Sequence, residues 1–445
     1  MKCGMISLGC PKNLVDTEVM LGLLKDSGYE ITPRAEEADV LIINTCAFID
    51  EAKEEAIENI FDMARFKEIG RCKGLIVTGC LSQRYSNELL HELPEVDAFV
   101  GSGEFHRIVE VVEKVLDGQR FSLRSEPDFI YDHTFSRVQT TPGHIAYIKI
   151  AEGCNNRCSY CIIPELRGRF RSRPIESILY EARALVKNGV KEIILVAQDT
   201  TRYGVDIYGE YSLARLLRQV ANIDGSLWVR ALYMYPTRFT DELIEVIASE
   251  PAICNYIDLP LQHIDDELLS KMRRQGRSKE IRSLIARLRT SIPDIVFRTS
   301  FIVGFPGETD EKFRSLLDFM KEVEFERVGV FKYSQEERTL AGEMPDQIDD
   351  EVKEERKNIA MEVQRLISRR HNHKRIGSVE EVLIDGRSDE SPLVTVGRSK
   401  GEAPEIDGLI YIGNQHPAPG EVKRVKIIDS GDYDLVGEIV DGSLK

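Results

Sequence analysis

Short apolar runs alternate with helix-like segments along the first 120 or so residues of this 445-residue chain. Each run has the length of one strand, and the segment after it spaces its apolar residues as a helix does. Such alternation predicts an α/β unit whose strands form a parallel sheet. The four predicted strands are CGMISLGC at 3–10, DVLIINTC at 39–46, KGLIVTGC at 73–80 and VDAFVG at 96–101.

Three of these four runs end in cysteine, at Cys10, Cys46 and Cys80. Since the carboxyl ends of neighbouring parallel strands meet at one sheet edge, where ligands usually bind, we expect the three thiols to converge. A single free cysteine is most often a small buried hydrophobe, but three at equivalent strand ends favour a metal role. The isolated cysteines begin or precede strands, and structural roles are predicted for them: Cys3, Cys72 and Cys254.

A second unit begins near Ile145 and contains six more apolar runs, which are separated by helical segments. Repeated strand-then-helix units predict an open, partial TIM βα barrel, because a closed one needs eight strands. An open barrel leaves a lateral mouth that suits a macromolecular side chain as substrate, and its chemistry lies at the carboxyl ends of the strands. The predicted strands are 145–154, 192–199, 227–236, 256–263, 296–308 and 327–334.

Cys154, Cys158 and Cys161 follow the first of these strands in a C-x3-C-x2-C pattern. This spacing is too short for the two separated ligand pairs of a zinc ribbon, and no fourth Cys or His lies nearby in the sequence. Three thiolates on a four-iron cube leave one iron without a protein ligand. That iron can bind the amino and carboxylate groups of S-adenosylmethionine (SAM), whose sulfonium an electron from the cluster then cleaves. The pattern favours a radical-generating 4Fe-4S site.

The sequence CNNRCSYC at 154–161 resembles the radical SAM enzymes, and its combination with three N-terminal cysteines resembles the methylthiotransferases among them. Several motifs are similar to the RimO-type branch, which modifies a ribosomal protein. The tRNA-modifying branches carry GCQ-x-N at the first cysteine, where this chain has Pro11. The motifs are SLGCPKN at 7–13, NTCAFI at 44–49, AQDTTRYG at 197–204, RTSFIVGFPGET at 298–309 and EAPEIDG at 402–408.

The resemblance implies a Rossmann/flavodoxin-like N-terminal domain whose three cysteines hold an auxiliary 4Fe-4S cluster, in addition to the radical SAM 4Fe-4S cluster. It implies that one SAM methylates sulfur at the auxiliary cluster and that a second SAM supplies the radical that removes hydrogen from a C–H bond. The carbon in this branch is the β-carbon of an aspartate in small-subunit ribosomal protein twelve, and electrons come from a donor such as flavodoxin. Both clusters must then face one cavity, which places the N-terminal domain over the barrel mouth.

Four residues are candidate cofactor contacts. The resemblance implies that Tyr160, just before the third cysteine, lies near the adenine. Asp199 and Thr200 follow the second barrel strand, where radical enzymes contact the amino group of SAM; the alternative is an ordinary polar turn. Arg298 reaches the cofactor carboxylate only if the strand register turns it into the barrel, which the sequence does not fix.

Gln262 and His263 are candidate substrate contacts, because they follow another strand's end. The alternative for His263 is a turn histidine whose hydrogen bonds are satisfied within the protein. The glycine-rich turn GFPGE at 304–308 is weak evidence for cofactor contact, because a tight backbone turn explains it equally well.

Four arginines alternate after the cysteine cluster, at Arg167, Arg169, Arg171 and Arg173. An extended segment would place all four guanidinium groups on one side. They could then bind nucleic acid phosphates, hold the cofactor carboxylate or pair with acidic groups of the neighbouring domain. The acidic composition favours the last two uses.

The long helix-like segment 349–375 is predicted to pack on the barrel through an apolar stripe. The stripe consists of Ile359, Val363, Leu366 and Ile367, and the charges around it are assigned to a solvated face.

Five short β-like runs after Ile376 predict a small antiparallel barrel of OB-like size, and this region resembles the TRAM domain. Residues 376–445 contain seven Lys or Arg and fourteen Asp or Glu, a net charge of −7. An RNA-binding barrel needs a positive groove, whereas an acidic one suits a basic protein partner. The predicted partner is a basic small-subunit ribosomal protein, alone or in its subunit, and nucleic acid is not directly required.

The sequence predicts three domains, at 1–125, 140–372 and 376–445, in a cytoplasmic protein without a secretory signal or a membrane segment. The odd count of nine cysteines argues against a disulfide framework, and the net charge of −16 disfavours a general phosphate-backbone binder. Two other functions stay open at this point. The first is a tRNA adenosine methylthiotransferase with the same clusters, and the second is a non-catalytic iron-sulfur carrier.

Overall fold

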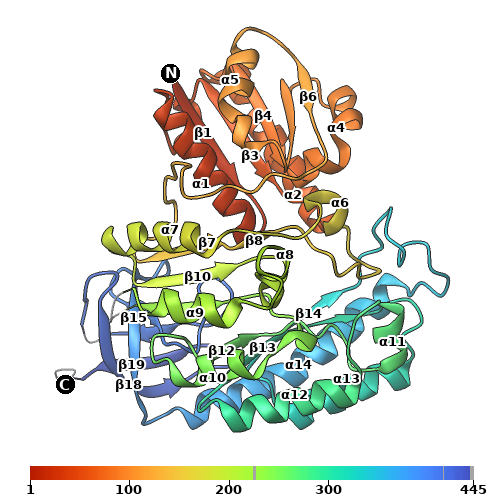
Figure 1. The fold of residues 1–445 in the computed structure, drawn as a ribbon, viewed down its shortest axis with the longest axis vertical. Coiled ribbons are helices and arrows are strands. Elements are labelled where there is room, and N and C mark those ends of the chain that lie inside the picture. Colours follow the sequence, from red (N-terminus) through yellow and green to blue (C-terminus); the bar gives the residue numbers. More distant parts are fainter. Residues whose placement is uncertain (224–226, 414, 441–445) are drawn as a thin grey trace.

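An all-parallel sheet of six strands organises the N-terminal part of the molecule (Figure 1). The computed structural model describes residues 1–223, 227–413 and 415–440. The strand order is β2-β1-β3-β4-β5-β6, the flavodoxin-like order with its switch point between β1 and β3. The strands are β1 (Lys2–Ser7), β2 (Glu30–Ile31), β3 (Val40–Thr45), β4 (Gly74–Gly79), β5 (Ala98–Gly101) and β6 (Phe121–Leu123).

Helices cover both faces of this sheet, so its central strands are apolar on both sides. In β3, Val40 and Ile42 pack toward α1 and α5, while Leu41 and Ile43 pack toward α2 and α4. The edge strands β2 and β6 were not predicted, because runs of two and three residues carry no recognisable alternation. The helices are α1 (Pro11–Asp26), α2 (Asp50–Ala64), α3 (Phe66–Ile69), α4 (Cys80–Glu92) and α5 (Ile108–Leu116).

The six predicted barrel strands are all present and lie in chain order as two parallel three-stranded sheets. A parallel bridge between Val229 and Ile253 connects the two sheets. Within the described residues no ladder pairs the last strand with the first, so the barrel is open, as predicted. The strands are β7 (Ile145–Lys149), β10 (Glu192–Val196), β11 (Trp228–Ala231), β12 (Tyr256–Asp258), β13 (Val296–Val303) and β14 (Arg327–Lys332).

Amphipathic helices pack around the outside of these strands and form the largest apolar core with them. Three of the helices begin at side-chain caps, because Thr240, Asp265 and Thr309 each accept a hydrogen bond from the first turn. No described helix combines the length and the apolar character that a membrane span requires. The helices are α7 (Ile175–Lys187), α8 (Val205–Tyr208), α9 (Leu213–Ala221), α10 (Asp241–Ser249), α11 (Asp266–Lys271), α12 (Ser278–Ser291) and α13 (Asp310–Val323).

Helix α14 (Asp350–Lys374) lies against β14 and α13, but not through the predicted stripe. Ile367 is buried and Val363 packs at the edge of the core, whereas Ile359 and Leu366 are exposed. The prediction for these two side chains is wrong, because polar residues occupy much of the buried face. Gln364, for example, is buried and donates from its amide to the carbonyl of Phe325 at 2.9 Å.

A closed five-stranded barrel ends the described chain, with the order β15-β16-β17-β19-β18. The five predicted runs correspond to its five strands, but the barrel is not wholly antiparallel, because β17 and β19 pair in parallel. Residues 441–445, the end of the predicted third domain, lie outside the described residues. The strands are β15 (Val379–Arg387), β16 (Thr395–Arg398), β17 (Ile410–Ile412), β18 (Val422–Ser430) and β19 (Leu435–Ile439).

The connection between β16 and β17 contacts the βα barrel, and it contains the motif EAPEIDG. Asp407 accepts a hydrogen bond from the hydroxyl of Tyr256 at 2.6 Å, and the carbonyl of Glu402 accepts one from Arg230 at 3.0 Å. The carboxylate of Glu402 is buried between Arg327 at 2.9 Å and Arg375 at 2.5 Å. This motif therefore fastens the small barrel to the large one.

Candidate active site

The three N-terminal cysteines lie at the carboxyl ends of adjacent strands. Cys10 follows β1 and caps α1, Cys46 follows β3, and Cys80 follows β4 as the first residue of α4. The pairings β1–β3 and β3–β4 bring these ends to one edge, at the switch point of the sheet. The predicted convergence of the strand ends is therefore present in the fold.

Gly9 lets the loop of Cys10 approach Cys46 closely. Its backbone φ of +88° is one that residues with a side chain rarely adopt. A Cβ at this position would lie 2.7 Å from Cβ and 3.3 Å from Sγ of Cys46. Any residue other than glycine at position 9 would therefore clash with Cys46. This close approach fits a group held jointly by Cys10 and Cys46.

Basic side chains surround this cysteine set. Burial opposes ionisation of Cys10, but Lys12 and Arg167 outweigh it and lower the pKa of this thiol. Burial, together with charges on Cys80 and Cys10, raises the pKa of Cys46 to about 12. Burial also raises the pKa of Cys80, against the opposing effect of Arg167. Each of the three thiols thus lies within electrostatic reach of another, and a cation is available to balance their negative charge.

The second cysteine set lies in the loop after the short strand β8 (Ala151–Glu152). Gly153 has φ of +77°, and a Cβ there would lie 2.2 Å from the carbonyl oxygen of Arg169. The N–H of Cys154 donates to the carbonyl of Gly168 at 3.1 Å, so the loop folds back on the segment that follows it. Burial raises the pKa of Cys154 to about 11 and also raises that of Cys161, and both thiols interact with Cys158.

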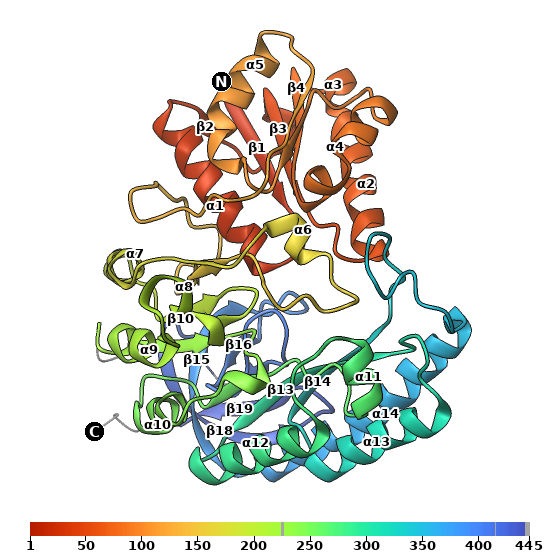
Figure 2. The same cartoon turned by 45° about the vertical axis from the view of Figure 1, so that its right-hand side comes forward.

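Helix α6 (Ile163–Arg167) joins the two cysteine sets. It begins two residues after Cys161, and Ile162 and Leu166 pack in the same core as Cys80 and Leu81 of α4. Figures 1 and 2 both show α6 between the N-terminal sheet and the barrel. One short helix therefore fixes the position of the radical SAM loop relative to the N-terminal domain.

Arg167, at the end of α6, is buried in contact with two residues of α1 and one of β8. Its guanidinium donates to Asp16 of α1 at 2.6 Å, to Glu152 at 3.3 Å and to the side-chain oxygen of Asn13. The predicted pairing of an arginine with acidic groups of the neighbouring domain is thus present at this position.

The prediction that all four arginines share one side is wrong, because the segment is not extended throughout. Arg167 closes a helix, and only Arg171 lies in a strand, β9 (Arg171–Ser172). Arg173 is buried separately and pairs with Glu181 at 2.7 Å, while Arg169 is exposed. The four guanidinium groups form no common basic surface.

Asp199 and Thr200 lie beside the radical SAM loop, but both are already hydrogen-bonded. Asp199 accepts from the amide of Asn156 in the cysteine loop at 2.9 Å and forms an ion pair with Arg238. Arg238 also donates to Asn156 at 2.7 Å, and the hydroxyl of Thr200 donates to the carbonyl of Leu232 at 2.8 Å. Asp199 therefore positions the loop of Cys154 in this structure.

The other candidate cofactor contacts lie on either side of this group. Arg298 alternates with the buried residues of β13 and donates to Asp258 at 2.8 Å. The phenol of Tyr160, partly buried, is affected by the charges of Cys158 and Cys161 and by Arg274, and burial raises its pKa. Tyr160 thus lies beside Cys158 and Cys161, and the guanidinium of Arg298 is paired with the carboxylate of Asp258.

The two candidate substrate contacts differ in their availability. His263 is fully buried, with Nε2 3.1 Å from Glu308 and Nδ1 accepting from the N–H of Asp265 at 3.0 Å, so the geometry matches the turn-histidine alternative. Glu308 also pairs with Arg356 of α14 at 2.8 Å, which gives the GFPGE turn a structural role. Gln262 has φ of +71°, and its side chain hydrogen-bonds to no other described residue.

The donor sets fit iron-sulfur cubes better than single ions. In the described ranges no three Cys, His, Asp or Glu side chains are gathered tightly enough to ligate one metal ion. A four-iron cube binds each thiolate through a different iron, so its ligands lie further apart than those of one ion. Each set offers three thiols, whereas a structural zinc takes four ligands.

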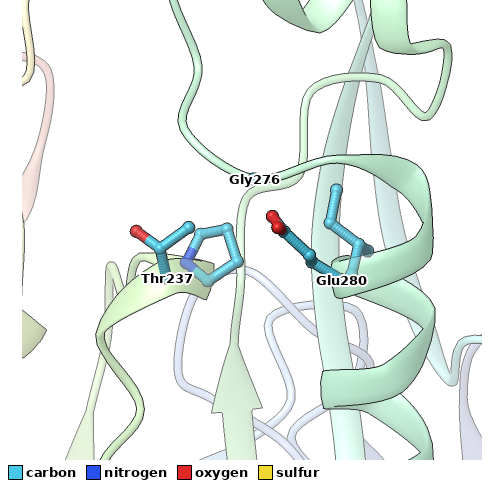
Figure 3. A pocket seen from close by; sticks show the side chains of 5 residues that line it. Thr237, Gly276 and Glu280 are labelled. Carbon is cyan, nitrogen blue, oxygen red and sulfur yellow. The ribbon is translucent and has the colours of Figure 1, made fainter.

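Two open surface pockets lie elsewhere. One of about 330 Å³ lies between the Pro236–Thr237 turn and Gly276, Glu280 and Ile281 (Figure 3). Another of about 400 Å³ lies at α8 and Thr240. Neither is lined by a cysteine or by a predicted site residue.

Three family models match the chain in the order of its three structural parts. The uncharacterized protein family UPF0004 matches residues 2–101, the radical SAM superfamily matches 148–320 and the TRAM domain matches 376–440. The ribosomal protein uS12 methylthiotransferase RimO of Desulforamulus reducens is 55% identical over 438 residues, which are 98% of this chain and 99% of the relative. The chain belongs to the RimO family. The RimO protein of Heliobacterium modesticaldum is 54% identical over 441 residues, 99% of this chain and 95% of the relative.

As a member of the RimO family, this chain is a radical SAM methylthiotransferase. The radical SAM match implies SAM and a 4Fe-4S cluster as cofactors. The fold is shared with a solved radical SAM methyltransferase, TsrM from Kitasatospora setae, at a TM-score of 0.55 over 77% of each chain. Since the two sequences are 16% identical, that likeness concerns the fold alone.

Sequence reasoning missed several residues that the structure places at the two cysteine sets. Lys12 and Asn13 stand in the motif SLGCPKN, which was used only as a resemblance. Arg238 and Tyr233 follow β11, whose strand end carried no predicted site residue. Both are polar residues after a barrel strand, which is where functional residues of βα barrels occur.

Proposed function

We propose that this protein adds a methylthio group to the β-carbon of an aspartate in ribosomal protein uS12. The observation that carries the proposal is the link between the two cysteine sets: α6 follows one set directly and packs in the core that contains Cys80 of the other. A methylthio transfer needs both sets at one substrate atom, and this helix supports their approach. The near full-length similarity to uS12 methylthiotransferases supports the choice of substrate.

Each set would hold one 4Fe-4S cluster: Cys154, Cys158 and Cys161 the radical SAM cluster, and Cys10, Cys46 and Cys80 the auxiliary one. The clusters and SAM supply the radical and the methylthio group when bound. The chain itself buries the thiols, places the cations Lys12 and Arg167 near them, and holds the loops in place through Gly9 and Gly153.

Among the other residues, Tyr160 would lie along the adenine, and Arg298 and Asp199 would shape the SAM site together with Asp258 and Asn156. Gln262, whose side chain has no hydrogen bond in the described part of the chain, would contact the substrate. Thr200 and His263 would act as structural members of their turns. The three domains, proposed at 1–125, 140–372 and 376–445, would divide these tasks between auxiliary cluster, radical chemistry and partner binding.

The partner would be basic uS12, bound with help from the acidic C-terminal barrel, whose net charge is −7 over residues 376–445. Electrons would come from a reduced protein such as flavodoxin. Direct binding of nucleic acid is not required for this reaction.

The test is an anaerobic incubation of the reconstituted protein with SAM, dithionite, small ribosomal subunits and tRNA, followed by mass spectrometry of both fractions. We expect one methylthio group on uS12, lost in both Cys10→Ala and Cys154→Ala. Cys72→Ala is the control, because Cys72 is buried away from both sets and should leave the modification in place. Modified adenosine in the tRNA fraction would instead show that the protein is a tRNA methylthiotransferase. Absence of SAM cleavage would support a non-catalytic iron-sulfur carrier.

A further inference from the structure

Lys12 is a buried cation without an acidic partner. Its side chain is 8% exposed, and its ammonium lies over the ring of Tyr233, 3.3 Å from the ring centroid. Throughout the described chain no carboxylate comes within 4.0 Å of this ammonium as an ion pair. Buried lysines are normally paired, because an unpaired charge loses its hydration without compensation. An aromatic ring compensates only in part, so the site has capacity for an anion.

The position of Lys12 is fixed from both domains. It is the second residue of α1, two residues after Cys10, while Tyr233 follows β11 of the barrel. The backbone of Tyr233 has a φ of +62°, which is strained for a residue other than glycine. Its N–H donates to Asp258 at 2.8 Å, and its carbonyl accepts from the N–H of Thr200 at 3.0 Å. The ring is therefore held where the auxiliary set meets the strand ends of the barrel.

The other buried or half-buried cations of this region, except Arg274, are paired with carboxylates. Arg167 pairs with Asp16 and Glu152, Arg238 with Asp199, and Arg298 with Asp258. Arg274 has no carboxylate partner either, but it lies beside Cys158 and Tyr160, on the radical SAM side. Lys12 is thus the unpaired cation on the auxiliary side.

We propose that the ammonium of Lys12 binds the carboxylate of the substrate aspartate. This inference rests on the proposed function. The carbon that receives the methylthio group is bonded directly to the carboxylate carbon of aspartate, so that carboxylate must lie next to the auxiliary set when the C–S bond forms. A cation two residues from Cys10 is placed to receive it, and the charge-assisted hydrogen bond would orient the β-carbon. Lys12 would thereby select aspartate over its neutral isostere, asparagine.

The experiment compares uS12 with a variant in which the target aspartate is replaced by asparagine, using kcat/KM for methylthio transfer. For the unsubstituted enzyme we expect a preference for aspartate of roughly 10- to 100-fold, the range of one hydrogen bond between charged groups. Lys12→Met should lose most of this preference and raise KM for uS12, while Lys12→Arg should keep most of it. Iron content per chain, measured in every variant, reports whether both clusters remain.

Lys53→Met is the matched control, since Lys53 also joins the N-terminal domain to the barrel side, through Glu336 at 3.0 Å, but lies outside the cysteine sets. It should keep the preference for aspartate. An unchanged preference in Lys12→Met with full iron content would overturn the inference, as would a loss of iron with an unchanged preference, which would assign Lys12 to the cluster. Absence of uS12 modification by the unsubstituted enzyme would instead contradict the proposed function.

Discussion

Arg167 and Arg169 stand two residues apart and have opposite environments. Arg167 is 2% exposed and pairs with Asp16 and Glu152, whereas Arg169 is exposed and has no ion pair in the described structure. Lys149 is also buried and pairs with the same two carboxylates. A buried ion network contributes little net stability over an apolar one, but losing one of its cations leaves an excess of buried negative charge. The sequence alone, with its regular alternation, gave no sign of this difference.

Arg167→Met should lower the stability of the cluster-free protein by about 3–5 kcal/mol, because the two buried carboxylates Asp16 and Glu152 would then share Lys149, which leaves one negative charge uncompensated. Arg169→Met should change it by less than about 0.5 kcal/mol. Thermal unfolding followed by circular dichroism measures both variants. Equal midpoints for the two variants would contradict the described network.

In helix α14, the apolar pattern of the sequence does not identify the buried face. Its buried face includes Ala360, Gln364, Ile367 and Ser368, so the polar side chains lie inward and two apolar ones outward. Apolar periodicity cannot identify a face whose buried positions are polar and hydrogen-bonded.

Ile367→Ala should therefore destabilise the protein by about 2–5 kcal/mol through loss of buried volume. Leu366→Ala, one residue earlier and 45% exposed, should cost less than about 0.5 kcal/mol. Denaturant unfolding of the cluster-free chain distinguishes them. A larger loss of stability in Leu366→Ala than in Ile367→Ala would show that Leu366 packs on the barrel, as the predicted stripe requires.

The strands were predicted more successfully than the helix faces, because each barrel strand is a short run rich in apolar residues. The two cysteine sets could also be predicted, since strand ends in a parallel sheet share an edge. The contacts of Lys12, Arg238 and Tyr233 could not, because their partners come from other domains or strands more than 30 residues away: Lys12 contacts Tyr233, and Arg238 contacts Asp199. Their roles depend on contacts that no local pattern encodes.

The connection between β16 and β17 carries a pH-sensitive contact. Burial alone would raise the pKa of Glu402, but Arg375 and Arg327 outweigh it and hold this pKa well below its ordinary value of 4.5. The folded protein thus keeps Glu402 ionised where the unfolded chain would bind a proton. Its contribution to stability is complete above about pH 4.5 and is lost as the pH falls below that value.

Glu402→Gln should lower the thermal midpoint at pH 7 and reduce the further fall between pH 5 and about pH 3. Exposed Glu405 provides the control, and the thermal midpoint of Glu405→Gln should equal that of the unsubstituted protein at each pH. If the thermal midpoints of Glu402→Gln and of the unsubstituted protein fall in parallel as the pH is lowered, Glu402 is not the titrating group.

For the whole molecule, charge governs the encounter with the partner. The chain carries a net charge of −16, and basic uS12 should be attracted from a distance. We expect the association rate constant to fall at least about tenfold between 50 mM and 500 mM NaCl, while the dissociation rate changes less. Stopped-flow measurement of labelled uS12 tests this, and a salt-independent association rate would contradict the electrostatic account.

The short helix α6 also has a consequence for the newly synthesised chain. Its Arg167 pairs with Asp16, which is made about 150 residues earlier. During translation, the first sheet can form while Asp16 still awaits its cation. The edge that carries Cys10, Cys46 and Cys80 is completed only after Cys154, Cys158 and Cys161 have emerged. The contacts between the two cysteine-bearing segments can therefore form only after residue 167 has been synthesised.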